Sequence, residues 1–240
     1  MFKIFRYELK RLAFSKFFII TLIVAAFFSI YVLNTKIIKG VGYTAPFSQW
    51  SFSCFLCEVQ PFLLLVLMFF ITMLFTKNET LVKEITLSTP ISYAKYFVLK
   101  ISSIFAAYFL ITSVFILISM GFYVFTFRFT NFSHFILPLL LILLPSFIFV
   151  FGIGLFLGSK KITWLYTFMP IVLILSFLKI EMSPFLDIFA KGFINHEPFI
   201  LPLGLSGEVD FKLSLIFIIS RIILIFFGGF SFISVLKRNI

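Results

Sequence analysis

The chain has 240 residues and a formal net charge of +11; 62% of its residues are hydrophobic, 21% are aromatic and only 12% are charged. That much apolar surface exceeds what a soluble core needs, so the composition excludes a water-soluble globular protein and predicts an all-α integral membrane protein. Membrane topology and attraction to anionic lipids account for the net positive charge, and we expect no nucleic-acid partner.

Residues 1–16 (MFKIFRYELKRLAFSK) are predicted to form an amphipathic helix along the membrane interface. Apolar residues recur there at helical spacing and basic residues supply another side: Phe2, Phe5, Leu9 and Leu12 against Lys3, Arg6, Lys10 and Arg11. The alternative is an ordinary basic flank before the first span, and the pattern alone leaves both interpretations open.

Six apolar runs follow, and together they make residues 1–240 a single transmembrane domain. A membrane-spanning helix needs about 17–25 apolar residues to cross roughly 30 Å of hydrocarbon. The sequence therefore predicts six spans, at residues 17–33, 59–76, 101–127, 135–159, 162–178 and 213–236.

The distribution of Lys and Arg predicts the orientation of these spans. With the N-terminus inside, the inner segments hold thirteen Lys and Arg residues and the outer segments six, while Arg221 lies within the last span. Because inner loops of membrane proteins are enriched in positive charge, we expect both termini in the cytoplasm. The expected location is a multi-pass position in the cell membrane, as in a bacterial plasma membrane.

Residues 77–100 form the predicted inner loop between the second and third spans. Residues 79–87 fit a short helix with Leu81 and Ile85 on one side and Lys83 and Glu84 on another. Thr89 has the position of an N-cap, and Pro90 suits the first turn of a second helix that continues into the third span. The loop is thus predicted to present a short helix, a break and another helix at the cytoplasmic surface.

The outer loop at residues 179–212 mixes Pro and Gly with apolar clusters such as PFLDIF and PFILPLG. A freely solvated loop would not keep so many apolar side chains, so we expect short interfacial or re-entrant helices before the last span. In the fourth span, Gly154 and Gly158 lie one helical turn apart, which predicts close helix packing within or between protomers.

The inner loop carries a resemblance to a known family. The stretch NETLVKEITLSTPISYAKYFVLK, residues 78–100, resembles the cytoplasmic loop between the second and third helices of ABC transporter permeases of the type-two exporter (ABC-2) class. The basic amphipathic N-terminus, the six spans and the apolar outer loop are similar to that family as well. The resemblance therefore covers essentially the whole chain.

The resemblance implies that residues 79–89 are a coupling helix that docks on a cytoplasmic ABC ATPase subunit. The implied coupling residues are Glu79, Leu81, Lys83, Glu84, Ile85, Thr89 and Pro90, and residues 1–16 would be the family's elbow helix. It also implies a second copy or a related permease subunit as partner. The implied function is ATP-driven export of a hydrophobic or amphipathic compound, such as a peptide, lipid or drug.

No nucleotide-binding site is expected in the chain itself. A P-loop needs a Gly-Lys pair whose backbone and ammonium group cradle phosphates, and the sequence has no Gly-Lys dipeptide. We therefore expect a transport subunit rather than an enzyme, without a cofactor or metal of its own, and with ATP hydrolysed by a partner chain.

Arg221 is the one basic residue predicted to lie inside a span. It follows Lys212 by nine residues, or about 13 Å along a helix, and buried charges in spans usually face the interior of the bundle. Glu58, near the outer end of the second span, is the best candidate partner. The alternative is a snorkelling side chain, or a last span that begins later.

The cysteine pair and an alternative function remain to be considered. Cys54 and Cys57 form a C-x-x-C pair without a second ligand pair or a thioredoxin-like setting, so we interpret them as small apolar residues. An ion-driven secondary transporter, or a stand-alone immunity or scaffold protein, is the alternative function. A secondary transporter usually shows more ionisable groups at midplane depth than these spans contain.

Overall fold

The apolar runs form helices in the computed structural model, which describes residues 2–42, 44–76, 79, 92–177, 187–194 and 211–239. This described part contains no strand, which agrees with the all-α expectation. Its α-helices are α1 (Phe2–Ala13), α2 (Lys16–Val32), α3 (Gln49–Met73), α5 (Tyr93–Phe127), α6 (Ile136–Lys160), α7 (Ile162–Phe177) and α9 (Leu215–Asn239). A π-helical turn, η1 (Leu33–Ile37), extends α2, and a 3-10 turn, η2 (Phe132–Phe135), precedes α6.

Among these described residues, five helices are long and apolar enough to cross a membrane. They cover Lys16–Ile37, Gln49–Met73, Ala94–Phe127, Phe132–Lys160 and Leu215–Lys237. The run predicted as the fifth span forms α7, a shorter apolar helix of 16 residues. The chain is therefore a multi-pass membrane protein with five helices of spanning length in its described part, and the predicted count of six is not confirmed.

The second membrane helix begins earlier than its apolar run predicted. Ser48 caps the helix by accepting a hydrogen bond from the backbone N–H of Ser51, so α3 starts at Gln49 rather than at Val59. Glu58 and Gln60 lie inside the helix, and the Gln60 side chain donates to the carbonyl of Ile142 on α6 at 2.8 Å. Partners on other segments pair with the Glu58 carboxylate and with the amide nitrogen of Gln60, and the helix continues through both residues.

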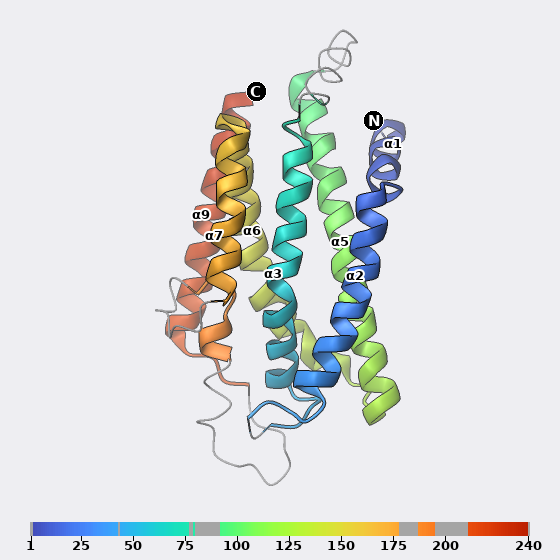
Figure 1. The fold of residues 1–240 in the computed structure, drawn as a ribbon. Coiled ribbons are helices and arrows are strands. Elements are labelled where there is room, and N and C mark those ends of the chain that lie inside the picture. The colour runs from blue at the N-terminus through green and yellow to red at the C-terminus, as the bar shows by residue number, and fades with distance from the viewer. Residues whose placement is uncertain are drawn as a thin grey trace.

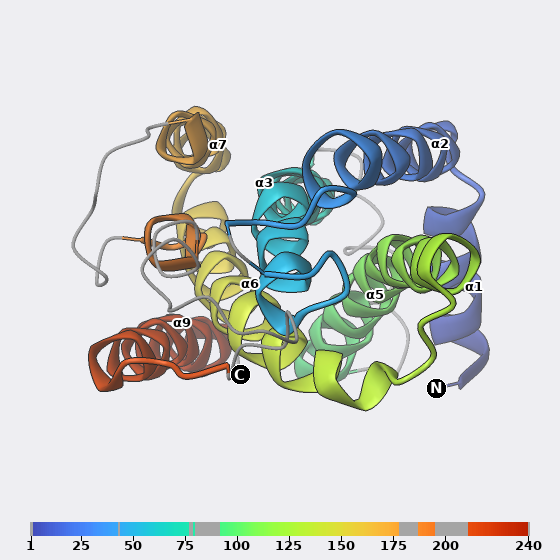
Figure 2. The ribbon, with the colours of Figure 1, turned by 90° about the horizontal axis from the view of Figure 1, so that it is seen from below.

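The helices pack in two groups around α3. On one side α6 contacts α9, α3 and α7, and on the other side α5 contacts α2, α1 and α3. The helix α1 lies across the bundle axis instead of along it (Figures 1 and 2). Its Leu12 is buried while Arg6 and Lys10 stay exposed, as an amphipathic surface helix requires.

Glycines allow the closest helix contacts. A Cβ atom on Gly152 of α6 would lie 2.0 Å from the carbonyl oxygen of Gly228 on α9, so any larger residue would force the two backbones apart. A Cβ on Gly154 would lie 2.9 Å from Ile71 of α3, and one on Gly158 would lie 2.4 Å from the ring of Phe75. Gly154 and Gly158, the predicted packing pair, thus face α3 and the turn after it within one protomer.

Both termini lie at the same end of the bundle, which we call the termini end (Figure 1). The close of α3, the start of α5 and the helix α1 lie at this end too. The opposite end holds residues 38–42 and 44–48 together with residues 187–194 of the predicted outer loop. Residues 191–194 are helical, and Phe189 and Ile194 are buried, so this piece inserts into the bundle.

Candidate functional site: a buried charge cluster at the termini end

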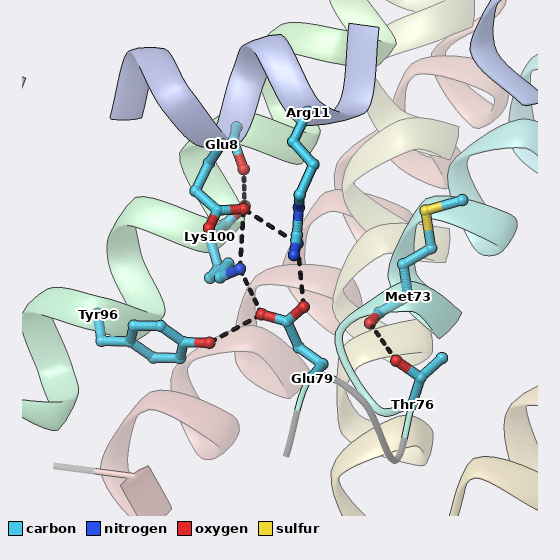
Figure 3. Close-up of polar contacts among 8 residues, drawn as sticks. Glu8, Arg11, Met73, Thr76, Glu79, Tyr96 and Lys100 are labelled. Atoms are coloured by element: carbon cyan, nitrogen blue, oxygen red, sulfur yellow. Dashed lines mark hydrogen bonds and ion pairs between the residues drawn. The ribbon is translucent and has the colours of Figure 1, made fainter. Parts of the chain in front are cut away.

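Five polar side chains from three distant parts of the sequence meet at the termini end (Figure 3). We call them the charge cluster: Glu8 and Arg11 of α1, Glu79 after α3, and Tyr96 and Lys100 of α5. The first pair is spaced i, i+3 and the last pair i, i+4, so each pair lies on one face of its helix. Helix geometry therefore places the two side chains of each pair close together, and the packing of α1 on α5 brings the two pairs into contact.

The cluster is continuous through its hydrogen bonds and ion pairs. Lys100 Nζ lies 2.8 Å from Glu8 Oε2 and also contacts Glu79 Oε1. Arg11 Nη2 lies 3.0 Å from Glu8 Oε2 and 2.9 Å from Glu79 Oε2. Tyr96 donates its hydroxyl proton to Glu79 Oε1 at 2.8 Å. Both carboxylates are thus shared between the two cations, and Glu79 accepts three partners at once.

Burial makes this arrangement energetically important. Lys100 is 4% exposed, and Glu8 and Glu79 are each 7% exposed. A buried ion without a partner costs several kcal/mol, so such groups persist only where charges and hydrogen bonds compensate them. Two carboxylates face two cations here, which leaves the cluster formally neutral.

The surroundings shift the ionisation of the two groups that lie outside the membrane-spanning helices. Burial raises the pKa of the Glu79 carboxyl, but hydrogen bonds from Lys100, Tyr96 and Arg11 lower it by more, so the pKa lies below its ordinary value. Burial lowers the pKa of Arg11, and its hydrogen bond to Glu79 with the charge of Glu8 raises it by more. Both groups are therefore held in their charged forms.

Glu79 is the only residue of the implied coupling set that the structure describes. It turns inward to the cluster, so its carboxylate is not available to a docking partner. It follows the end of α3, where the Thr76 hydroxyl donates to the carbonyl of Met73 at 3.1 Å. The other six implied residues, Leu81, Lys83, Glu84, Ile85, Thr89 and Pro90, lie outside the described residues.

Arg221 has partners other than the predicted one. Its side chain is 1% exposed, and Nη1 donates to the carbonyl oxygen of Ile188 at 3.1 Å while Nη2 donates to that of Asp187. Its guanidinium carbon lies 4.7 Å from the ring centre of Phe217. The residue therefore faces the bundle interior, as predicted, and it anchors the inserted residues 187–194 to α9.

Glu58 does not pair with Arg221, which corrects the expected ion pair. Its carboxylate lies 2.9 Å from Lys36 Nζ on η1 and 3.7 Å from Lys191 Nζ on the inserted segment. The inserted segment presents a lysine to Glu58 and backbone carbonyls to Arg221, so each charge finds a nearer partner. In the described part of the chain, residues 187–191 contact both Glu58 and Arg221.

Cys54 and Cys57 are buried thiols on consecutive turns of α3. No group of three or more His, Cys, Asp or Glu residues within the described parts of the chain is placed to hold a metal ion. The pair packs within the hydrophobic core, which fits the interpretation of small apolar residues.

Sequence reasoning missed most of the charge cluster, because Glu8, Arg11, Tyr96 and Lys100 resemble ordinary charges and aromatics at a membrane border. Their i, i+3 and i, i+4 spacings were the available signal.

A search of protein-family models, of curated proteins and of solved structures finds no match to this chain.

Proposed function

We propose that this chain is the membrane-spanning subunit of an ATP-driven transporter, with residues 80–91 as the contact for a separate ATPase subunit. The termini end faces the cytoplasm in this proposal. The cargo is a hydrophobic or amphipathic compound, such as a peptide, lipid or drug, and a second copy or a related subunit completes the pathway. The proposal rests on the sequence resemblance and on one structural observation, the charge cluster.

The charge cluster supports the proposal by its position. Glu79 and α5 bracket residues 80–91, and both form ion pairs with α1: Glu79 with the partly exposed Arg11, and Lys100 of α5 with the buried Glu8. A force applied to residues 80–91 would therefore reach α1, α3 and α5 together rather than one helix end. A coupling element needs such a rigid base, because an ATPase biases a membrane pathway only by favouring one arrangement of its helices over another.

In this mechanism Glu79 is a positioning residue, and the side chains of residues 80–91 make the contact. ATP-driven closure of the ATPase displaces residues 80–91, and the cluster transmits the displacement to α1 and α5. Buried charge pairs suit this task, since they separate only at a high free-energy cost and so move as one unit.

The first test is a photo-crosslinking residue at Thr86 in the full chain, in its native membrane. We expect a crosslinked partner whose sequence contains a P-loop, and the same residue at Lys39, near the opposite end, should not capture it. Glu84→Lys should then abolish transport-linked stimulation of ATP hydrolysis while the chain still inserts. Repeated absence of a P-loop partner, with ion-gradient-driven transport by the purified chain, would overturn the proposal in favour of a secondary transporter.

A further inference from the structure

A groove of about 580 Å³ lies between α1, α5, α6 and α9 in the half of the bundle nearest the termini end. The helices α5 and α9 lie on either side of α6 (Figure 2). Phe5 of α1 and Phe105 of α5 line it on one side, Gly229 and Phe232 of α9 on the other, and Phe147 and Phe151 of α6 between them. The volume is within the range of pockets that hold small ligands.

The groove is an aromatic trough open to its surroundings. Phe147 and Phe151 stack with ring centres 5.4 Å apart and are buried. Phe105 packs edge-on against Phe147 at 5.4 Å, and Phe232 lies 5.9 Å from Phe151. Phe105 itself remains 50% exposed. The walls are thus apolar apart from Ser102.

The depth of the groove matches one leaflet of a bilayer. Phe151 lies nine residues before Lys160 and Phe147 thirteen, which places them about 13 and 20 Å along α6 from that charged end. Half of a roughly 30 Å hydrocarbon core is about 15 Å. The groove therefore runs from the surface helix α1 to the middle of the membrane, a span that suits an extended hydrocarbon chain.

Two cations lie close in the sequence to residues that line the surface end of the groove. Lys95 lies seven residues, two helical turns, before Ser102, which also lines the groove, so the two residues share one face of α5. Arg6 follows Phe5 on α1. Both cations are exposed, and neither forms an ion pair with another residue in the described parts of the chain. The nearby carboxylates of Glu8 and Glu79 are already engaged in the charge cluster.

We propose that this groove is a binding site for one anionic phospholipid of the leaflet at the termini end. One acyl chain lies over Phe147 and Phe151, and Lys95 and Arg6 contact the phosphate of the headgroup. The site does not depend on ATP-driven transport. Phe5 lies on α1, the helix that carries Glu8 and Arg11 of the charge cluster. A bound lipid therefore also links α1 to α9.

Gly229 offers a direct test, because a Cβ atom added there meets nothing within 4 Å. Gly229→Leu therefore places a side chain in the groove without displacing the backbone. Gly121 on α5 is equally open but lies outside the groove, so Gly121→Leu is the matched control. Native mass spectrometry of the purified full chain measures retention of phosphatidylglycerol and of phosphatidylcholine with the same acyl chains.

We expect the wild-type chain to retain one phosphatidylglycerol at least tenfold more tightly than phosphatidylcholine. Gly229→Leu should weaken that retention at least tenfold, and Gly121→Leu should leave it unchanged. Equal weakening by both glycine variants, or no effect of Gly229→Leu, would overturn the site.

The headgroup is tested separately. The double variant Arg6→Gln with Lys95→Gln should abolish the preference for phosphatidylglycerol, while Lys39→Gln, near the opposite end, should keep it. An unchanged preference in the double variant would overturn the assignment of an anionic lipid. A photoreactive residue at Phe105 should give a lipid adduct, whereas a product joining two chains would assign the groove to a second copy.

Discussion

The two ends of the bundle stabilise buried ions in different ways. At the termini end, the charges of Glu8 and Glu79 are matched by those of Arg11 and Lys100, and only side chains take part. At the opposite end, the guanidinium of Arg221 is matched by the backbone carbonyls of residues 187 and 188. The first arrangement is built from side-chain charges alone, whereas the second combines backbone dipoles with the charge of the nearby buried Asp187 carboxylate.

This difference predicts how each end responds to substitution. Removing one cation from the charge cluster leaves a buried carboxylate whose charge is no longer compensated. Removing Arg221 leaves two carbonyl oxygens without donors, whereas the nearby Asp187 carboxylate keeps its hydrogen bonds from the backbone N–H groups of Lys191 and Gly192. A buried uncompensated ion is more costly than an unsatisfied neutral dipole, so the termini end should be the more sensitive.

The largest effect is expected for Lys100→Met. Methionine keeps most of the side-chain volume but leaves Glu8 and Glu79 with Arg11 as their only cation, so the free energy of unfolding should fall by about 3–5 kcal/mol. Equilibrium unfolding in mixed detergent micelles measures it. Lys161→Met, at an exposed position of the same end, is the control and should change stability little. A loss equal to that of the control would mean that the cluster is not a stabilising unit.

Arg221→Met should have a smaller effect, a loss of about 2 kcal/mol in the free energy of unfolding, because two hydrogen bonds from a charged donor disappear with the charge. Residues 187–194 should become accessible to hydrogen exchange before the rest of the chain. Arg128→Met changes an exposed arginine in the same way and should do neither. Faster exchange at α1 instead of residues 187–194 would contradict the anchoring role of Arg221.

The apolar runs predicted the helices well because bilayer thickness sets the length of an uninterrupted apolar segment. The prediction was wrong at the start of α3, where Glu58 and Gln60 interrupt the run. The amide nitrogen of Gln60 donates to the carbonyl of Ile142, and Glu58 pairs with Lys36 and Lys191, all of them far away in the sequence.

In the candidate site, too, the partners of the buried charges are distant in the sequence and could not be predicted from it. The depth and inward orientation of Arg221 follow from its place in a span, but its partners depend on how residues 187–194 fold back. Lys100 looked like a flanking charge at the border of a span, and only the packing of α1 on α5 places it between two carboxylates. A local pattern thus indicates that a charge is buried, whereas tertiary packing decides what compensates it.

The smallest effect concerns pH and tests the charge cluster at the termini end. The pKa of Glu79 is lower in the folded chain than its ordinary value of 4.5, so the folded state favours the carboxylate. Its stabilising contribution is complete above about pH 4.5 and is lost as the pH falls through the lowered pKa. Glu79→Gln should therefore be less stable than the wild-type chain at pH 7, and the difference should shrink as the pH is lowered below 4.5. Unfolding measured at several pH values checks this. A difference that is constant with pH would mean that Glu79 acts through its shape and not its charge.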